Sequence, residues 1–216
     1  IMHEDYLERS LLATTFLNND AYFTTENVPY IRNKNPKKFS LVLDFDETLI
    51  YFKIDIEMET DGVLRLRPDV FTFLQEVKKY YELILFSEAT QSYVDLLLES
   101  FEENQKYFDY KLYRQHTVIE AQDFVKDLTR IGRPLDSIII IDNSPQNFRL
   151  QNKNGIVIKS FWGEDNTDNA LKDLIPILKD IAMTENDVRK GLDRYHDIIA
   201  SKITSNLFKH DKTKNF

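Results

Sequence analysis

Two carboxylates separated by a single residue, Asp44 and Asp46, directly follow the apolar run Phe39–Leu43. Carboxylates so close together in an extended turn can face one ligand, so that one attacks while the other moves protons. A third acid, Asp142, follows another apolar run much later in the chain. Three crowded acids repel one another unless a cation neutralises them, and hard oxygen ligands favour Mg²⁺. With Lys126 contributing positive charge from a loop, the set suits a phosphoryl group.

An alternation of strands and helices is expected to position these side chains. Short apolar runs indicate buried strands, and the segments between them carry apolar residues at helical spacing. This alternation predicts an α/β fold with a doubly wound, mainly parallel sheet. The expected strands span residues 39–43, 82–86, 110–113, 137–141 and 155–158, and the expected helices run through residues 70–77, 93–98 and 169–178.

The carboxyl ends of the strands are where such a sheet binds its ligand. Asp44, Ser87 and Asp142 follow the first, second and fourth expected strands, so three polar side chains distant in sequence should meet at one edge. The alternative for the aspartates is that they are ordinary solvated loop acids. The alternative for Ser87 is an N-cap of the following helix, a position at which serine is common.

A β-hairpin insertion is expected after the first strand. Ile54, Ile56 and Met58 alternate with acidic residues, and the favoured turn dipeptide Asp61–Gly62 precedes a second strand at residues 63–66. The insertion is too short to form a large lid. An uncovered site suits phosphate on a protein segment better than a small metabolite that must be enclosed.

The remaining segments are assigned to accessory roles. Residues 1–38 are expected to form an N-terminal arm, residues 39–183 the central domain, and residues 184–216 a C-terminal helical extension. The basic run at residues 32–38 fits a solvated linker better than an anion site. The apolar stripe of the extension favours packing on the domain, and binding of a protein partner is the alternative.

Composition excludes several classes of protein. The 216 residues include 36 acidic and 28 basic side chains, a formal net charge of −8, which disfavours nucleic-acid binding. There is no cysteine, so thiolate catalysis and thiolate metal sites are excluded. The 5 glycines form no dinucleotide or nucleotide loop, and no apolar run is long enough to span a membrane. The chain begins with Ile1 rather than Met, which leaves open a trimmed natural N-terminus and a lost targeting or anchoring segment.

The segment Leu41–Leu49 resembles the D-x-D-x-T signature of haloacid-dehalogenase-type phosphatases. More narrowly, it is similar to the Fcp/Scp, or NLI-interacting-factor-like, phosphatases, which act on the C-terminal domain of RNA polymerase II. Further motifs follow in that family's order, and the resemblance covers about residues 39–182. They are Leu66–Pro68, Leu85–Ser87, Val125–Leu128 with Arg130–Arg133, and Ile141–Pro145. The resemblance implies a haloacid-dehalogenase-like sheet.

The resemblance also implies a role for each matching residue. Asp44 would be the nucleophile that forms an aspartyl-phosphate. Asp46 would protonate the leaving serine or threonine oxygen and then activate the hydrolytic water. Thr48 and Ser87 would donate hydrogen bonds to phosphoryl oxygens, and Lys126 would stabilise charge on the phosphoryl group and the nucleophile.

A Mg²⁺ ion is implied by the same resemblance. Its ligands would be Asp44, the backbone carbonyl of Asp46, and Asp142 or Asn143. Arg114 stands where the family often places an arginine that contacts the substrate.

Some residues depart from the family pattern. Phe45 replaces the leucine that is common between the first two aspartates. Glu88 follows Ser87 where the family commonly has alanine, which adds negative charge near a phosphate site. The region between Tyr51 and Arg67 is also shorter than the one that forms a proline pocket in the small polymerase-tail phosphatases. The polymerase tail is therefore one candidate substrate among phosphoproteins.

These observations favour a Mg²⁺-dependent protein serine/threonine phosphatase in the nucleus or cytoplasm, with a phosphoprotein as its partner. One alternative is a phosphatase-like binding module, because the same domain occurs in a mitochondrial import receptor subunit that has lost the catalytic acids. Another is a small-molecule phosphatase of the same superfamily.

Overall fold

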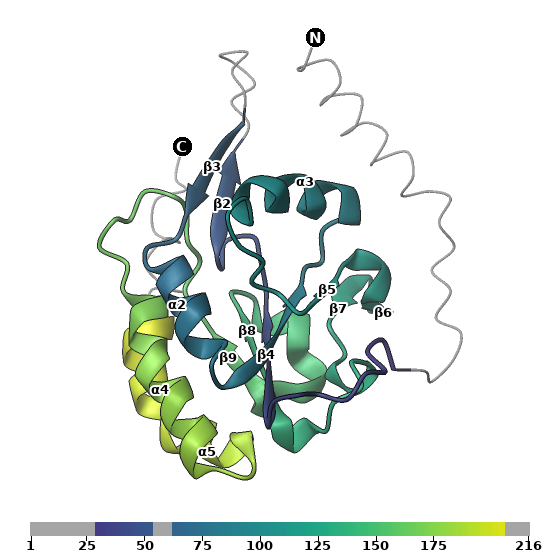
Figure 1. Cartoon of the computed structure of the whole chain (residues 1–216), viewed down its shortest axis with the longest axis vertical. Helices are drawn as coiled ribbons and strands as arrows, with labels where there is room; N and C mark the ends of the chain where they lie inside the picture. The colour runs from purple at the N-terminus through teal and green to yellow at the C-terminus, as the bar shows by residue number, and fades with distance from the viewer. Residues whose placement is uncertain (1–28, 54–61, 206–216) are drawn as a thin grey trace.

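The computed structural model describes residues 29–53 and 62–205. A five-stranded parallel sheet, in the order β5-β4-β1-β8-β9, forms its centre (Figure 1). The prediction of a doubly wound parallel sheet is confirmed, with strand ends displaced by about one residue from those expected. These strands are β1 (Phe39–Leu43), β4 (Tyr81–Phe86), β5 (Tyr110–Leu112), β8 (Ile138–Asp142) and β9 (Gly155–Val157).

Apolar side chains on both faces of the sheet explain why the strands read as continuous hydrophobic runs. Alternate residues of one strand point to opposite faces, so Leu41 and Leu43 join one buried cluster and Val42 joins another. Figure 1 shows α2, α4 and α5 together on one side of the sheet. The helices are α2 (Val70–Val77), α3 (Gln91–Phe101), α4 (Ala170–Thr184), α5 (Val188–Arg194) and α6 (His196–Ile198).

Short helical turns and a small hairpin cover the other face. Leu128 and Phe148 pack there with Ile31 from the N-terminal segment. The hairpin, formed by β6 (Val118–Glu120) and β7 (Asp123–Val125), was not predicted from the sequence. These turns are η1 (Arg114–His116), η2 (Leu128–Arg130), η3 (Leu135–Ser137) and η4 (Pro145–Asn154). A further turn at the end of the described chain, η5 (Ile199–Thr204), packs with α4 on the helix side of the sheet.

The hairpin insertion after β1 is present, but its register differs from the prediction. Strand β2 (Ile50–Lys53) pairs antiparallel with β3 (Val63–Leu66), and Lys53 lies opposite Val63. A two-residue turn at Asp61–Gly62 therefore does not close this hairpin, and the expected strand at residues 54–58 lies outside the described residues. Strand β2 forms at residues 50–53, before the expected position, because Ile50 is fully buried and Phe52 packs edge-on against Tyr93, with 6.1 Å between the ring centroids.

The two ends of the described chain are tied to the domain. The backbone N–H of Ile31 donates to the carbonyl of Ile131 at 3.1 Å, and Ile31 is buried. At the other end Val188 and Ile203 are fully buried, so the apolar stripe of the C-terminal segment packs inside the molecule. The helix predicted there is interrupted at Tyr195, where the backbone leaves helical geometry. Within residues 29–53 and 62–205, no helix is long and apolar enough to cross a membrane.

Candidate active site

Asp44 and Asp142 stand at the carboxyl ends of the adjacent strands β1 and β8. The chain departs from β1 toward β4 on one side and later returns to β8 on the other, so the two acids mark the switch point of the sheet. The backbone N–H of Asp44 donates to the carbonyl of Ile141 at 3.0 Å, which continues the ladder to the end of the strand. Ser87 ends the neighbouring strand β4 in the same way, by donating its N–H to Leu112.

Lys126 joins the two acids. Its Nζ donates to Asp44 Oδ1 at 2.7 Å and to Asp142 Oδ2 at 2.6 Å, and its side chain is completely buried. The backbone N–H of Lys126 donates to the carbonyl of Asn147, which fixes the point where the lysine leaves β7. A buried ammonium therefore lies between two buried carboxylates, an arrangement that only close pairing makes tolerable.

Burial and the neighbouring charges shift the pKa values of Asp44 and Lys126. Burial raises the pKa of the Asp44 carboxyl to about 8, against the opposing effect of the nearby Lys126 charge. Burial alone would lower the pKa of the Lys126 ammonium, but the charges of Asp142 and Asp44 outweigh it, and the pKa is raised. The two carboxylates therefore favour the charged form of Lys126, and a cation bound beside Asp44 would favour its ionised form.

A tight turn after β1 presents the side chains of the first motif. Glu47 has a positive φ of 58°, and the backbone N–H groups of Leu49 and Ile50 both donate to Phe45. The turn brings Thr48 Oγ1 within 2.8 Å of Asp44 Oδ2, to which it donates. Thr48 is fully buried, so in this structure it orients the Asp44 carboxylate from behind.

Arg67 supports that turn from within the domain. Its guanidinium donates to the carbonyl of Thr48 at 3.1 Å and to Asp168 Oδ2 at 2.8 Å. Both side chains are buried, so the ion pair is desolvated. Sequence reasoning recognised Arg67 as part of a motif but found no partner for it, because Asp168 lies a hundred residues further along.

Asp46 faces the same site from the turn. Burial raises the pKa of its carboxyl, and the hydroxyl of Tyr93 donates to Asp46 Oδ1 at 2.7 Å, which acts in the opposite direction. A raised pKa favours the protonated form of the carboxyl, from which a proton can be transferred. Tyr93 was predicted only as part of the apolar face of α3.

Asp142 and Asn143 are each held by neighbouring polar groups. The backbone N–H of Ser144 and the side-chain amide of Asn147 donate to Asp142 Oδ1 at 2.8 and 3.1 Å. Asn143 Nδ2 donates to Glu47 Oε2 and to Ser160, both at 3.0 Å. Asn147, which lies just beyond the last motif, was not predicted as a site residue.

An open cavity of about 410 Å³ lies over these groups. Five of the predicted site residues line it, whereas Thr48, Lys126 and Asp142 lie beneath it. Ser87 Oγ accepts a hydrogen bond from the N–H of Ala89 at 3.0 Å, so its own proton can be donated into the cavity. The N-cap of α3 is Thr90, not Ser87. The five predicted site residues that line the cavity are Asp44, Asp46, Ser87, Arg114 and Asn143.

The donor atoms of the site fit a hard divalent cation. The cavity and its floor carry more carboxylates than cations, so that a bound cation would favour the entry of a phosphoryl dianion. Within residues 29–53 and 62–205, no three acidic or histidine side chains converge on one metal position. A cation would therefore be held by Asp44, Asp142 and backbone or amide oxygens, an incomplete shell that suits Mg²⁺ because Mg²⁺ keeps several waters. The carboxylates that line or underlie the cavity are Asp44, Asp46, Glu47, Glu88 and Asp142, and the cationic side chains there are Lys126 and Arg114.

Comparison with known proteins shows the fold and the family of this chain. The fold matches a solved structure of Fcp1, described as an essential RNA polymerase II CTD phosphatase, with a TM-score of 0.55 and 18% identity over 76% of this chain and 65% of that one. Residues 39–189 match the family of NLI interacting factor-like phosphatases. The chain belongs to this family, as its motifs predicted.

Two relatives illustrate the similarity. Phosphatase PSR1 of Saccharomyces cerevisiae is 33% identical over 203 residues, which cover 88% of this chain and 47% of that protein. CTD nuclear envelope phosphatase 1B of Danio rerio is 33% identical over 189 residues, 77% of this chain and 76% of that protein. The chain thus spans about half the length of PSR1 and most of the length of the Danio rerio protein.

Proposed function

We propose that this chain is a Mg²⁺-dependent protein serine/threonine phosphatase that acts through an aspartyl-phosphate on Asp44. The observation that carries the proposal is the buried Lys126 ammonium between Asp44 and Asp142, with Asp46 beside them in one open cavity. Membership of a phosphatase family supports it. Residues 39–183 would be the catalytic unit, and residues 1–38 and 184–216 accessory segments.

In the first step a carboxylate oxygen of Asp44 attacks phosphorus, and the bond from phosphorus to the serine or threonine oxygen breaks. Asp46 donates its proton to that leaving oxygen. In the second step Asp46 takes a proton from water, the water oxygen attacks phosphorus, and the bond to Asp44 breaks to release phosphate. Burial suits Asp46 to this role because it raises the pKa of the carboxyl.

The other side chains orient the reacting groups. Ser87 and Arg114 line the cavity and would donate to phosphoryl oxygens. Lys126 balances the charge that builds up on the phosphoryl group and on Asp44. Thr48 holds the second oxygen of Asp44, so that the first can face the substrate.

Asp44, Asp142, the backbone carbonyl of Asp46 and the amide oxygen of Asn143 would hold the Mg²⁺ ion. Its chemistry there would be to neutralise the acids and to polarise a phosphoryl oxygen. The amide nitrogen of Asn143 already donates to Glu47 and Ser160, so its oxygen is the atom that remains for a cation.

A phosphorylated protein segment is the substrate class that we propose. The catalytic cavity is open, so an extended peptide can reach Asp44. The RNA polymerase II C-terminal domain is one candidate, supported by the description of the Fcp1 structure. The relatives named as nuclear envelope phosphatases support a site of action in the nucleus or cytoplasm.

Removal of metal tests the proposal directly. With an aryl phosphate at mildly acidic pH, we expect turnover in Mg²⁺ and turnover at the background rate after EDTA, restored by excess Mg²⁺. The reason is that the acids outnumber the cations around the cavity, and only a bound cation offsets this repulsion. Initial rates of phosphate release measure the effect. Full activity in EDTA would contradict metal dependence, and no turnover by folded, Mg²⁺-loaded protein would favour a binding module.

Replacing Asp46 by asparagine should affect substrates unequally. For a phosphoserine peptide we expect a loss of about two to four decades in kcat, the usual contribution of general acid–base catalysis. Formation of the phosphoenzyme from an aryl phosphate should lose less, because a phenolate leaves without a proton. Single-turnover rates on both substrates separate the two cases. Equal losses on both would argue that Asp46 only supports the fold of the turn.

A further inference from the structure

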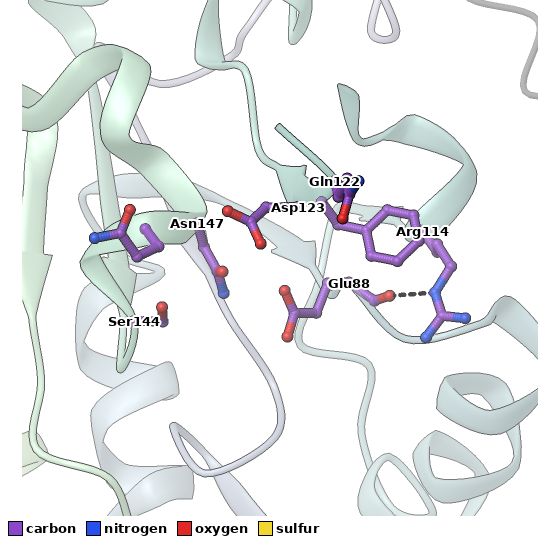
Figure 2. A pocket seen from close by; sticks show the side chains of 8 residues that line it. Glu88, Arg114, Gln122, Asp123, Ser144 and Asn147 are labelled. Carbon is purple, nitrogen blue, oxygen red and sulfur yellow. Dashed lines mark hydrogen bonds between the residues drawn. The ribbon is translucent and has the colours of Figure 1, made fainter. Parts of the chain in front are cut away.

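A second cavity of about 350 Å³ adjoins the catalytic cavity (Figure 2). The two share four lining residues, so they are neighbouring parts of one opening. An extended peptide advances about 3.3–3.6 Å per residue, so a side chain flanking a phosphoserine bound at Asp44 can reach the second cavity. The shared residues are Glu88, Arg114, Ser144 and Asn147.

The second cavity has a negatively charged wall. Figure 2 shows the carboxylates of Glu88 and Asp123 directed toward the same space. Asp123 also pairs with Arg149, at 3.3 Å, whereas Glu88 makes no ion pair within the described part of the chain. Two carboxylates therefore face a space into which a substrate side chain can enter.

The arginine of this wall is held away from those carboxylates. Arg114 Nε donates to the backbone carbonyl of Glu88 at 2.7 Å, and the guanidinium lies 4.9 Å from the centroid of the Phe124 ring. Figure 2 shows the guanidinium pointing away from the Glu88 carboxylate. The Arg114 guanidinium therefore makes no ion pair with the Glu88 carboxylate.

Glu88 also presents a problem for phosphate binding. It follows Ser87 directly and lines the catalytic cavity, where its charge repels a phosphoryl dianion. Partial burial raises the pKa of the Glu88 carboxyl, against the opposing charge of Lys126, so the site already disfavours this charge. A cation supplied by the substrate would remove both costs.

We propose that Glu88, with Asp123, selects phosphopeptides that carry a lysine or arginine beside the phosphorylated residue, with the cationic side chain in the second cavity. This inference rests on the proposed phosphatase function and adds a substrate class to it. A second phosphate or an acidic side chain is disfavoured there, because the carboxylates of Glu88 and Asp123 face the space and Arg114 is assigned to the phosphoryl group bound at Asp44.

A phosphoserine peptide series tests the inference. One residue is varied among Lys, Ala and Glu at each of the two positions before and after the phosphoserine, and kcat/KM is measured at low ionic strength. At one or more positions we expect Lys to exceed Glu by about tenfold, the combined effect of one favourable and one unfavourable charge pair at a partly exposed site. Added NaCl should reduce this ratio by screening.

Variants of Glu88 identify the residue responsible. Glu88→Gln should reduce the ratio of Lys to Glu peptides severalfold, with Asp123 retaining the remainder, and Glu88→Lys should reduce it further. Asp193→Lys, an equal charge reversal on α5 that lines neither cavity, should retain the wild-type ratio. The ratio is taken within each variant, so a change in overall activity does not affect it, and Glu88→Gln keeps the test open if Glu88→Lys fails to fold.

Two outcomes would overturn the inference. Equal kcat/KM for Lys, Ala and Glu at every position, or a preference for Lys that is undiminished in Glu88→Gln, would remove Glu88 as the selecting residue. If the wild type still hydrolyses the peptides and an aryl phosphate, the proposed function stands without the subsite. If it hydrolyses neither, the proposed function fails, and this inference fails with it.

Discussion

Asp44→Asn is expected to reduce the hydrolysis of both aryl phosphates and phosphopeptides by about 10⁴-fold or more, to background. An amide oxygen is a far weaker nucleophile than a carboxylate, and no other carboxylate occupies the same place at the end of β1. Asparagine has nearly the same shape, and its oxygen can still accept from Thr48 or Lys126, so the fold should survive. Unlike the Asp46 variant, this one should lose activity on every substrate.

Initial-rate kinetics and acid-quenched mass spectrometry measure the two parts of this prediction. During turnover the wild type should carry a phosphoryl group on Asp44, and the Asp44→Asn variant should carry none. Asp136→Asn, at an exposed position that lines neither cavity, is the matched control and should retain wild-type rates. Circular dichroism and melting temperature show whether the variant is folded. Wild-type turnover in folded Asp44→Asn would exclude this nucleophile.

The same variant distinguishes the enzyme from a binding module. If wild type and Asp44→Asn both lack turnover yet bind one partner protein equally well without phosphate, the domain is a binding module whose contact does not need the Asp44 carboxylate. If the variant instead binds a phosphopeptide that the wild type consumes, the enzyme interpretation gains direct support. Pull-down with phosphorylated and unphosphorylated forms of one peptide separates the two outcomes.

The sequence predicted the edge of the sheet on which the site lies because strand ends follow from the alternation of strands and helices. Asp44, Ser87 and Asp142 needed no contact information, since parallel strands place their carboxyl ends together. The depth of each side chain could not be obtained in this way. Lys126 is buried beneath the cavity in a hydrogen bond to Asp44, 82 residues earlier in the chain, and Thr48 is buried there by the tight turn that directs its hydroxyl to Asp44.

Supporting residues were missed where their local pattern has an ordinary explanation. Tyr93 belongs to the apolar face of α3, and nothing in that periodicity reveals that its hydroxyl reaches Asp46. Asn147 follows a proline-containing turn, a setting in which asparagine is common. Only the tertiary fold directs its amide to Asp142.

The β6–β7 hairpin was missed for a different reason. Two-residue hairpin turns with positive φ are recognised by Asn-Gly or Asp-Gly, but Ala121 and Gln122 adopt φ values of 50° and 73° here. Arg149, which pairs with Glu120 and Asp123 across the hairpin, stabilises a turn whose own residues do not favour it. Tertiary contacts override local preference at the wall of the second cavity.

Lys126→Met is expected to impair both stability and catalysis. The variant keeps the unbranched apolar stem but removes the ammonium between Asp44 and Asp142, which leaves two buried carboxylates without a cation. Breaking a buried ion pair in this way costs about 3–5 kcal/mol of unfolding free energy. Hydrolysis should fall by about 10⁴-fold, because both charge stabilisation of the transition state and orientation of the nucleophile are lost. Urea unfolding and phosphopeptide kinetics measure the two effects.

The response of the variant to Mg²⁺ gives the sharper test. A cation that binds only the folded state raises the melting temperature. In Lys126→Met the ion would also take over the neutralisation of Asp44 and Asp142, so Mg²⁺ should raise its melting temperature more than it raises that of the wild type. Lys172→Met, at an exposed position on α4, should behave as the wild type in both measurements. Stability within about 1 kcal/mol of the wild type without Mg²⁺ would contradict the prediction, because an unpaired buried charge costs more than that.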